Sequence, residues 1–184
     1  MKGCENYGKI LANGYQKVRA AGICPGAGNF LDCKNYGAVE LGPNVLANAN
    51  TGSFIGNITG YQQGDKHPIV NCEAYGDLIM TAPKQMAGGY FGVIGAIPNA
   101  QVSGKCVCKI IGPAGCYAGM VTGYCNATDD FVVGTKDAPM YIGGSIIIDG
   151  VETKLTKENY LSYWIDWDKT EGGHTTEFIL FTDK

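Results

Sequence analysis

The sequence is poor in arginine, in histidine and in charge of either sign. Its 184 residues include 14 lysines and arginines, of which only Arg19 is an arginine, and charged residues make up 17% of the chain. The net charge is -3. Such a chain has no basic surface of the kind that binds phosphate backbones. We therefore expect no nucleic-acid partner.

Long apolar runs are also missing. Crossing a bilayer takes about 20 apolar residues, and the longest candidate, YIGGSIIID at 141–149, is short and interrupted by glycines. We expect no transmembrane segment in this chain. The N-terminal stretch MKGCENYG has no apolar signal region and enters a repeat almost at once. This start predicts a piece of a larger protein whose targeting signal or anchor lies elsewhere.

Catalytic motifs are absent as well. The chain has no phosphate-binding loop, no G-x-S-x-G elbow and no H-E-x-x-H motif. Its two histidines, His67 in GDKHPI and His174 in EGGHTT, are typical of solvated loops, and no cysteine has a histidine near it in sequence. The adjacent acids Asp129 and Asp130 are typical of a solvated turn. We expect no catalytic residues and no cofactor.

Glycine and cysteine, by contrast, are abundant and periodic, with 28 and 8 residues. Four C-x-x-x-G units occur: CENYG from Cys4, CKNYG from Cys33, CEAYG from Cys72 and CKIIG from Cys108. A second phrase lies between them: GICPG at 22–26, GSFIG at 52–56, GGYFG at 88–92 and GCYAG at 115–119. Two phrases that alternate along the chain predict a repeat architecture.

Each unit reads as a short strand, a turn and a second short strand. Strands this short are stable only when successive coils stack about 4.8 Å apart, so that equivalent side chains form columns. The sequence therefore predicts an all-β fold, a right-handed parallel β-helix (solenoid) of about four coils over residues 1–128.

The stacking predicts ladders of equivalent residues. The cysteines would form an interior column in which a free thiol packs as a small hydrophobe. A glycine would stand at each bend, where a positive φ is needed. The predicted columns are Cys4, Cys33, Cys72 and Cys108; Tyr7, Tyr36, Tyr75 and Ile111; Gly8, Gly37, Gly76 and Gly112; and, in part, Asn6 and Asn35.

The cysteine pattern leaves one question open and argues against a metal. Disulfides between ladder neighbours are conceivable but would strain a tight stack, so whether any cysteines pair stays open. Cys106 and Cys108 would face the same way on a strand. Their C-x-C spacing is a poor match to the two-residue spacing of common zinc sites, and we expect no metal site.

After residue 128 the repeat stops, and residues 129–184 predict a small C-terminal α/β cap. SIIIDGVETKLT reads as a hairpin with its turn at Asp149–Gly150. TKENYLSYWIDW has a helical period with Thr156 as N-cap, and EFILFT at 177–182 reads as a strand. Such a unit would cover the open end of the solenoid.

The alternation of G-x-x-x-G with C-x-N-Y-G resembles the GLUG-type and related cysteine–asparagine repeats in large surface proteins of gut anaerobic bacteria. The resemblance covers residues 3–125, although CKIIG lacks the Asn-Tyr pair and Ala74 replaces asparagine in the third unit. It implies an exported, extracellular or cell-surface β-helical stalk or binding module, with no catalytic residues to carry over.

Three functions stay open on these grounds. The first is a non-catalytic surface module for structural display or adhesion, with a glycan or a host or microbial surface protein as partner. Tyr163 and Trp167, in the densest aromatic cluster of the chain, are its candidate ligand-binding residues. The second is a polysaccharide-cleaving β-helix enzyme, a lyase or hydrolase, which would need clustered carboxylates. The third is a structural spacer with no pocket.

Overall fold

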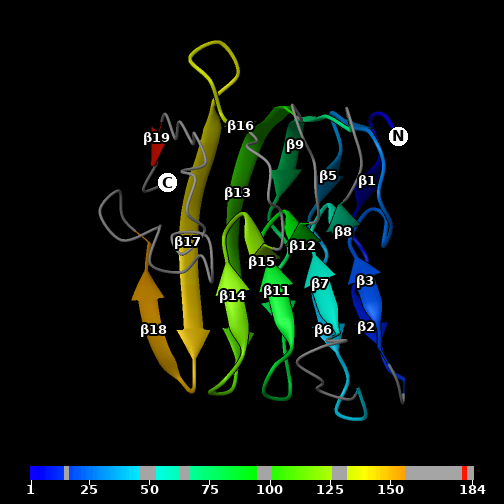
Figure 1. Ribbon diagram of the computed structural model, residues 1–184, viewed down its shortest axis with the longest axis vertical. Helices are drawn as coiled ribbons and strands as arrows, with labels where there is room; N and C mark the ends of the chain where they lie inside the picture. Colours follow the sequence, from blue (N-terminus) through cyan, green and yellow to red (C-terminus); the bar gives the residue numbers. More distant parts are fainter. Residues whose placement is uncertain are drawn as a thin grey trace.

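The computed structural model describes residues 1–14, 17–45, 53–62, 67–94, 101–125, 132–155 and 180–181. Every regular element in these ranges is a strand, and nearly all strand pairs are parallel, each strand beside its equivalent one turn away (Figure 1). Four successive turns each add one strand to a four-stranded sheet. The predicted parallel β-solenoid of about four turns is therefore confirmed.

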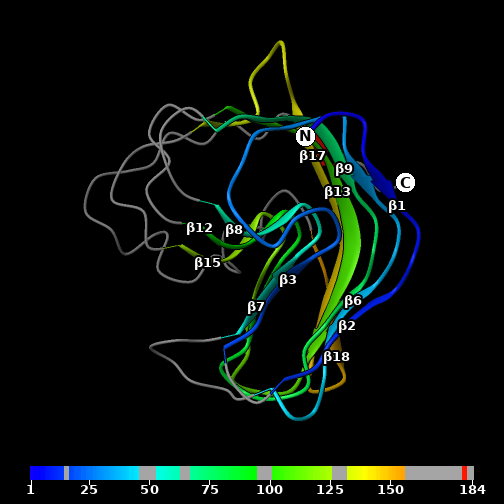
Figure 2. The ribbon, with the colours of Figure 1, turned by 90° about the vertical axis from the view of Figure 1, so that its right-hand side faces the viewer.

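The second, third and fourth turns each pass through three sheets, which Figure 2 shows nearly end-on. The first turn reaches the third of these sheets only through an isolated bridge from Cys24 to Thr59. A large twelve-stranded sheet forms one long curved wall. A four-stranded sheet contains β3 (Arg19–Ala21), β7 (Phe54–Gly56), β11 (Met86–Gly88) and β14 (Tyr117–Gly119). A three-stranded sheet contains β8 (Thr59–Gln62), β12 (Phe91–Ile94) and β15 (Thr122–Cys125).

The large sheet collects between one and three strands from every turn. Its first half contains β1 (Glu5–Asn6), β4 (Phe30–Leu31), β5 (Lys34–Asn35), β9 (Ile69–Ala74) and β16 (Val132–Val133). Its second half contains β2 (Ile10–Ala12), β6 (Val39–Leu41) and β10 (Leu78–Ile79). The long strands β13 (Gln101–Gly112) and β17 (Met140–Ile148) run through both halves.

The residue before each of the first three repeat cysteines is in the left-handed region. Gly3, Asp32 and Asn71 have φ of 62°, 55° and 53°. Glycine, aspartate and asparagine are the residues that adopt this conformation most readily. The kink lets Cys72 point into the core only three residues after the buried Ile69. The repeat unit is therefore better written with a glycine, aspartate or asparagine before its cysteine.

The glycines after the tyrosines are required for a different reason from the predicted positive φ. Gly37 and Gly76 do not have positive φ. A Cβ on Gly37 would lie 2.1 Å from the carbonyl oxygen of Gly8, and one on Gly76 would lie 2.0 Å from that of Gly37. The glycines let adjacent turns approach closely at the corner, so this prediction was right about the residue and wrong about the cause.

Asparagine side chains hold the same corner from inside. Asn6 donates from Nδ2 to Asn35 Oδ1 at 2.7 Å, and Asn35 donates to the carbonyl oxygen of Gly37 at 2.8 Å. In the third turn Ala74 cannot do this. Asn57, from the opposite wall, accepts from Asn35 and donates to the carbonyl oxygen of Gly76 at 3.0 Å. The asparagine column is therefore completed by a residue from outside the cysteine units.

The predicted ladders hold for three turns and fail in the fourth. Cys4, Cys33 and Cys72 lie in register, because Glu5 pairs with Lys34 and Lys34 with Glu73. In β13, however, the residue beside Cys72 is Gly104, and Cys106 lies beside Ala74.

The fourth unit is therefore shifted by four residues from the predicted alignment. Cys108 lies at the ladder position that Gly76 occupies in the third turn. Val107 lies at the position that Tyr75 occupies there. Ile111 pairs with Ile79 instead, and Gly112 pairs with Ile148. The predicted places of Cys108, Ile111 and Gly112 in the ladders were wrong, because β13 runs straight through the corner at which the earlier turns bend.

The second phrase is also aligned differently from the prediction. Gly56, Gly88 and Gly119 share one register. Gly56 and Gly119 are the last residues of GSFIG and GCYAG, whereas Gly88 is the first residue of GGYFG. The three phrases as predicted are therefore not equivalent in the structure. The phrase that keeps register is GNITG, GGYFG and GMVTG, from the same three glycines onward.

The C-terminal part continues the large sheet. β17 pairs with β13 over nine positions, from Gly104–Met140 to Gly112–Ile148, so the sheet extends across the predicted boundary between residues 128 and 129. The predicted hairpin is confirmed: β17 pairs antiparallel with β18 (Val151–Lys154), with Asp149 and Gly150 at φ of 53° and 78°.

Part of the predicted cap lies outside the described residues. Within the predicted strand at 177–182, β19 (Leu180–Phe181) pairs with β17. The predicted helix from Thr156 lies outside them. Among the residues that the structure describes, no helix is long and apolar enough to cross a membrane.

Candidate functional site

The outer face of the large sheet carries a column of alternating charge. The residue after each repeat cysteine points outward, because its neighbours in the strand point inward. Register places Glu5, Lys34, Glu73, Lys105 and Tyr141 side by side on five successive strands. Opposite charges on neighbouring strands stabilise a sheet by a few tenths of a kcal/mol per pair. This column is the base of the candidate site.

Beside the charges lies a stack of three tyrosines on the same outer face. The Tyr7 and Tyr36 ring centroids are 4.8 Å apart with an interplanar angle of 6°, and those of Tyr36 and Tyr75 are 5.2 Å apart at 8°. The predicted column is thus confirmed for the three tyrosines. It faces solvent: Tyr7 is 69% and Tyr36 39% exposed.

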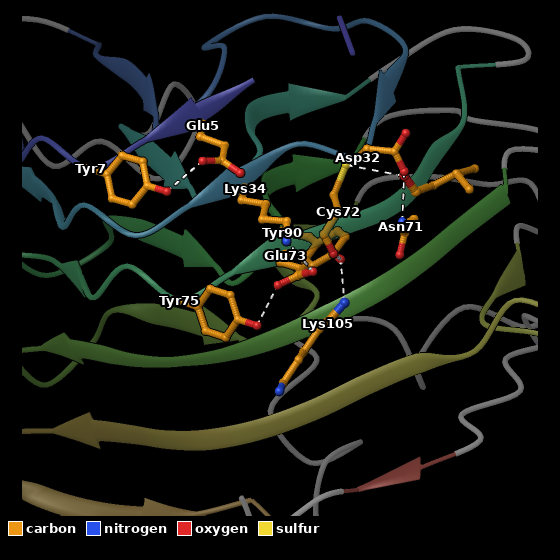
Figure 3. Close-up of polar contacts among 11 residues, drawn as sticks. Glu5, Tyr7, Asp32, Lys34, Asn71, Cys72, Glu73, Tyr75, Tyr90 and Lys105 are labelled. Carbon is orange, nitrogen blue, oxygen red and sulfur yellow. Dashed lines mark hydrogen bonds and ion pairs between the residues drawn. The ribbon is translucent and has the colours of Figure 1, made fainter. Parts of the chain in front are cut away.

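The phenols and the charges form one network, which Figure 3 shows in close-up. The hydroxyl of Tyr75 donates to Glu73 at 2.6 Å, as that of Tyr7 does to Glu5. Lys34 Nζ lies 3.0 Å from a carboxylate oxygen of Glu73. The ammonium of Lys105 lies 5.6 Å from the ring centroid of Tyr75, within cation–π range.

Glu73 remains a carboxylate in this network. Burial by itself would raise its pKa, but the hydrogen bond from Tyr75 and the ion pair with Lys34 outweigh burial and hold the pKa below its usual value. The pKa of the Tyr75 phenol is raised, by burial first and then by its hydrogen bond to Glu73. Glu73 is therefore an acceptor at neutral pH, and Tyr75 is a donor.

The column of charges leads into a pocket of about 500 Å³ over β9, β13 and β17. The lining side chains that carry a charge, an amide or an aromatic ring are those of Asn71, Glu73, Tyr75, Lys105, Asp137 and Tyr141. Asn71 is exposed and donates to Asp32 at 2.8 Å, an arrangement that is also visible in Figure 3. The pocket thus combines two carboxylates, one ammonium, one amide and two phenols.

One rim of the pocket is a short turn before β17. Gly134, with φ of 77°, donates its N–H to the carbonyl oxygen of Val102 at 2.7 Å. Within the turn, Thr135 and Ala138 exchange hydrogen bonds, from the N–H of Thr135 to the carbonyl of Ala138 and from the N–H of Ala138 to Thr135 Oγ1. These bonds fix the turn that carries Asp137 to the pocket.

A buried tyrosine lies behind the strands that line the pocket. The Tyr90 hydroxyl, on the inner side of the sheet, donates to the carbonyl oxygen of Cys72 and accepts the N–H of Lys105 at 2.9 Å. A Cβ on Gly104, whose φ is 128°, would lie 2.4 Å from that hydroxyl oxygen. Tyr90 therefore occupies the gap in the ladder between β9 and β13 and positions Lys105.

The buried cysteines have the properties of core residues. Burial raises the pKa of Cys72 to about 12 and that of Cys116 to about 11, and it raises the pKa of Cys106 well above its usual value. Thiols with raised pKa values are poor nucleophiles. The cysteines for which the structure describes a side chain are all free: Cys4, Cys24, Cys33, Cys72, Cys106, Cys108 and Cys116.

Most residues that the sequence singled out for binding or chemistry lie outside the described part of the chain. Tyr163 and Trp167, the candidate ligand-binding residues, lie outside the described residues, as do His174 and the pair at 129–130. His67 is part-exposed, and its Nδ1 lies 2.8 Å from Asn29 Oδ1. Asn57 begins the sequence Asn57-Ile58-Thr59, which matches an N-glycosylation acceptor, but its side chain is fully buried, so the folded protein offers no acceptor there.

Sequence reasoning missed the pocket, although part of its signal was present. The residue after the repeat cysteine alternates between glutamate and lysine, at Glu5, Lys34 and Glu73, and this alternation predicts an outward charged column. Asp137 and Tyr141 lie outside the repeat. No local pattern marks them, because their place depends on the pairing of β17 with β13.

Comparison of the chain with family models, with curated proteins and with solved structures found no match to any of the three.

Proposed function

We propose that the chain is a non-catalytic glycan-binding module of an exported bacterial surface protein, and that the pocket over β9, β13 and β17 holds the sugar. The single observation that carries the proposal is the lining of that pocket. Sugar sites combine an aromatic ring with carboxylate and amide groups that take the hydroxyls. Tyr75 and Tyr141 supply the rings, and Asn71, Glu73 and Asp137 supply the polar groups.

The size and the charge of the pocket narrow the ligand. Its volume of about 500 Å³ lies within the range of small-molecule sites, roughly 300–1,000 Å³. Two carboxylates against one ammonium among its polar groups disfavour a polyanion, because like charges in a pocket repel. A neutral oligosaccharide is therefore the favoured class, ahead of an acidic one. A pure spacer would need no such pocket.

The position of the pocket favours a polymer end or a side branch that lies along the solenoid. The tyrosine stack continues from Tyr75 to Tyr36 and Tyr7 on the same outer face. Stacked rings cover each other's faces, so that their edges are what a ligand meets, and the hydroxyl oxygens of Tyr7 and Tyr75 keep a lone pair for accepting while their protons are donated to Glu5 and Glu73. The phenol oxygens at this edge can form hydrogen bonds with sugar hydroxyls. A sugar ring can stack on the outer face of Tyr7, which no other tyrosine of the stack covers.

A polysaccharide-cleaving enzyme is the second candidate, because Glu73 and Asp137 line the same pocket. Hydrolysis needs a carboxyl group whose raised pKa keeps it protonated as a general acid. The pKa of Glu73 is shifted the other way, and its oxygens are held by Tyr75 and Lys34. A lyase acts on acidic polymers, which the pocket charge disfavours. Binding is therefore the better-supported function.

Binding is tested on a panel of immobilised neutral and acidic glycans, followed by calorimetry on any neutral hit. Asp137→Ala and Tyr141→Ala should each weaken binding at least tenfold. Lys136→Ala is the matched control, since Lys136 is exposed on the same turn and does not line the pocket; it should bind as the wild type does.

Three results would contradict the proposal. The first is a panel without any hit. The second is a hit that Asp137→Ala and Tyr141→Ala leave unchanged. The third is release of reducing ends from the bound glycan, which would replace binding by the enzyme alternative.

A further inference from the structure

Three sulfur atoms meet inside the solenoid, away from the outer pocket. Cys106 and Cys108 are two residues apart on β13, and their side chains point into the core, as the C-x-C spacing predicted. Met120 follows β14 on the facing wall. All three are buried, with exposed fractions of 0%, 3% and 1%.

The sulfurs form a nearly equilateral triangle. Cys106 Sγ lies 3.8 Å from Cys108 Sγ, and Met120 Sδ lies 4.0 Å from each of them. The point equidistant from the three sulfurs is about 2.3 Å from each, which is the length of a metal–thiolate bond, about 2.3 Å. A metal ion at the centre would need almost no movement of its ligands.

The neighbouring residues leave room for this cluster. A Cβ on Gly89 would lie 2.2 Å from Cys106 Sγ, so any side chain there would overlap the sulfur. In register, Cys106 and Cys108 also replace the asparagine and the glycine that earlier turns use to bend the chain. The fourth turn thus has no asparagine and glycine at the corner, and it places two thiols on one face of a straight strand.

Ligand chemistry selects the ion. Two thiolates and a thioether are soft ligands, which favour Cu(I), and three-coordinate geometry suits that ion. Zinc in structural sites takes four ligands in a tetrahedron. Among the residues that the structure describes, no group of three or more His, Cys, Asp and Glu side chains could supply such a set.

We propose that the protein binds one Cu(I) ion in the core through Cys106 Sγ, Cys108 Sγ and Met120 Sδ. Each thiol loses its proton to solvent as its bond to copper forms, so that one Cu(I) replaces two protons and no electron is transferred. Two thiolates and one Cu(I) together carry one negative charge, half that of the two thiolates alone. This site does not depend on the proposed glycan function.

The first test is a competition titration of the reduced protein, without oxygen, against the chromophoric Cu(I) chelator bicinchoninate. The wild type should take up one Cu(I) and release two protons. Met120→Leu should weaken binding at least tenfold, and the double variant Cys106→Ser, Cys108→Ser should lose the site. Cys33→Ser is the matched control, a buried thiol in the repeat ladder, and should bind as the wild type does.

The second measurement keeps the proposal falsifiable if a variant fails to fold. Wild-type protein with selenomethionine in place of methionine should show a copper–selenium distance in its copper K-edge X-ray absorption spectrum, beside two copper–sulfur distances. Copper bound without selenium in its coordination shell would overturn the site. So would failure to compete with the chelator, or equal loss of copper in the Cys33→Ser control.

Discussion

Replacing Gly37 by alanine tests how the turns of the solenoid approach one another. The added Cβ would lie 2.1 Å from the carbonyl oxygen of Gly8, 2.6 Å from its carbonyl carbon and 3.0 Å from Asn6 Nδ2. Ordinary van der Waals contact begins at 3.4 Å. The first and second turns must therefore separate by about 1.3 Å at this corner, and most of the atoms in the way are backbone.

The cost follows from what that separation disturbs. The N–H of Tyr36 bonds to the carbonyl of Asn6 at 2.8 Å, and Asn6 Nδ2 bonds to Asn35 Oδ1 at 2.7 Å. Overpacking costs about 1–3 kcal/mol, and a lost hydrogen bond about 1 kcal/mol. We expect Gly37→Ala to lower the free energy of unfolding by about 2–4 kcal/mol.

Urea unfolding followed by circular dichroism measures this loss. With a slope of about 2 kcal/mol per M, the midpoint should fall by roughly 1–2 M. Gly26→Ala is the matched control, since a Cβ there meets nothing within 4 Å and the residue has no positive φ. It should change stability by less than about 1 kcal/mol. Equal effects of the two variants would refute the close approach of the turns at the glycine corner.

Three further predictions concern buried polar groups. Asn57→Ala leaves the carbonyl of Gly76 without the side-chain donor that the structure gives it, and it should cost about 1–3 kcal/mol by urea unfolding; an unchanged midpoint would count against the role of Asn57 at this corner. Tyr90→Phe removes the hydroxyl between the carbonyl of Cys72 and the N–H of Lys105 and should cost about the same, with faster hydrogen exchange of that N–H. Because burial raises the pKa of Cys72 from 9.0 to about 12, its contribution to stability is complete below about pH 9 and is lost as pH rises towards 12. Wild type should therefore lose stability with pH more steeply in that window than Cys72→Ala, by about 1.4 kcal/mol per pH unit, and equal slopes would contradict the neutral buried thiol.

The first three turns could be predicted from sequence because their signals are local. A cysteine, an outward residue and a glycine recur at fixed offsets, and each offset follows from strand geometry. The same local matching failed in the fourth turn. CKIIG at Cys108 looks like a repeat unit, but register is set by Gly104, where the Tyr90 hydroxyl enters the ladder from the bend between β11 and β12.

The pocket and the sulfur cluster could not be predicted for the same physical reason. Asp137 and Met120 come from segments outside the cysteine repeat, and the repeat does not fix where they meet β13. Likewise, Asn57 donates the hydrogen bond to the carbonyl of Gly76 that Ala74 cannot donate. No sequence pattern near residue 57 predicts this contact with the opposite wall. Contacts between walls depend on how the whole chain coils, which a local pattern does not encode.

The scalar coupling across backbone hydrogen bonds tests the parallel stack most directly. Isotope-labelled, deuterated protein should show a coupling between the amide nitrogen of Glu73 and the carbonyl carbon of Cys33, and a second between Lys34 and Cys4, since both N–H···O distances are 2.8 Å. Couplings from Glu73 to a carbonyl outside the second turn, or a pattern of reciprocal pairs typical of antiparallel strands, would contradict the solenoid.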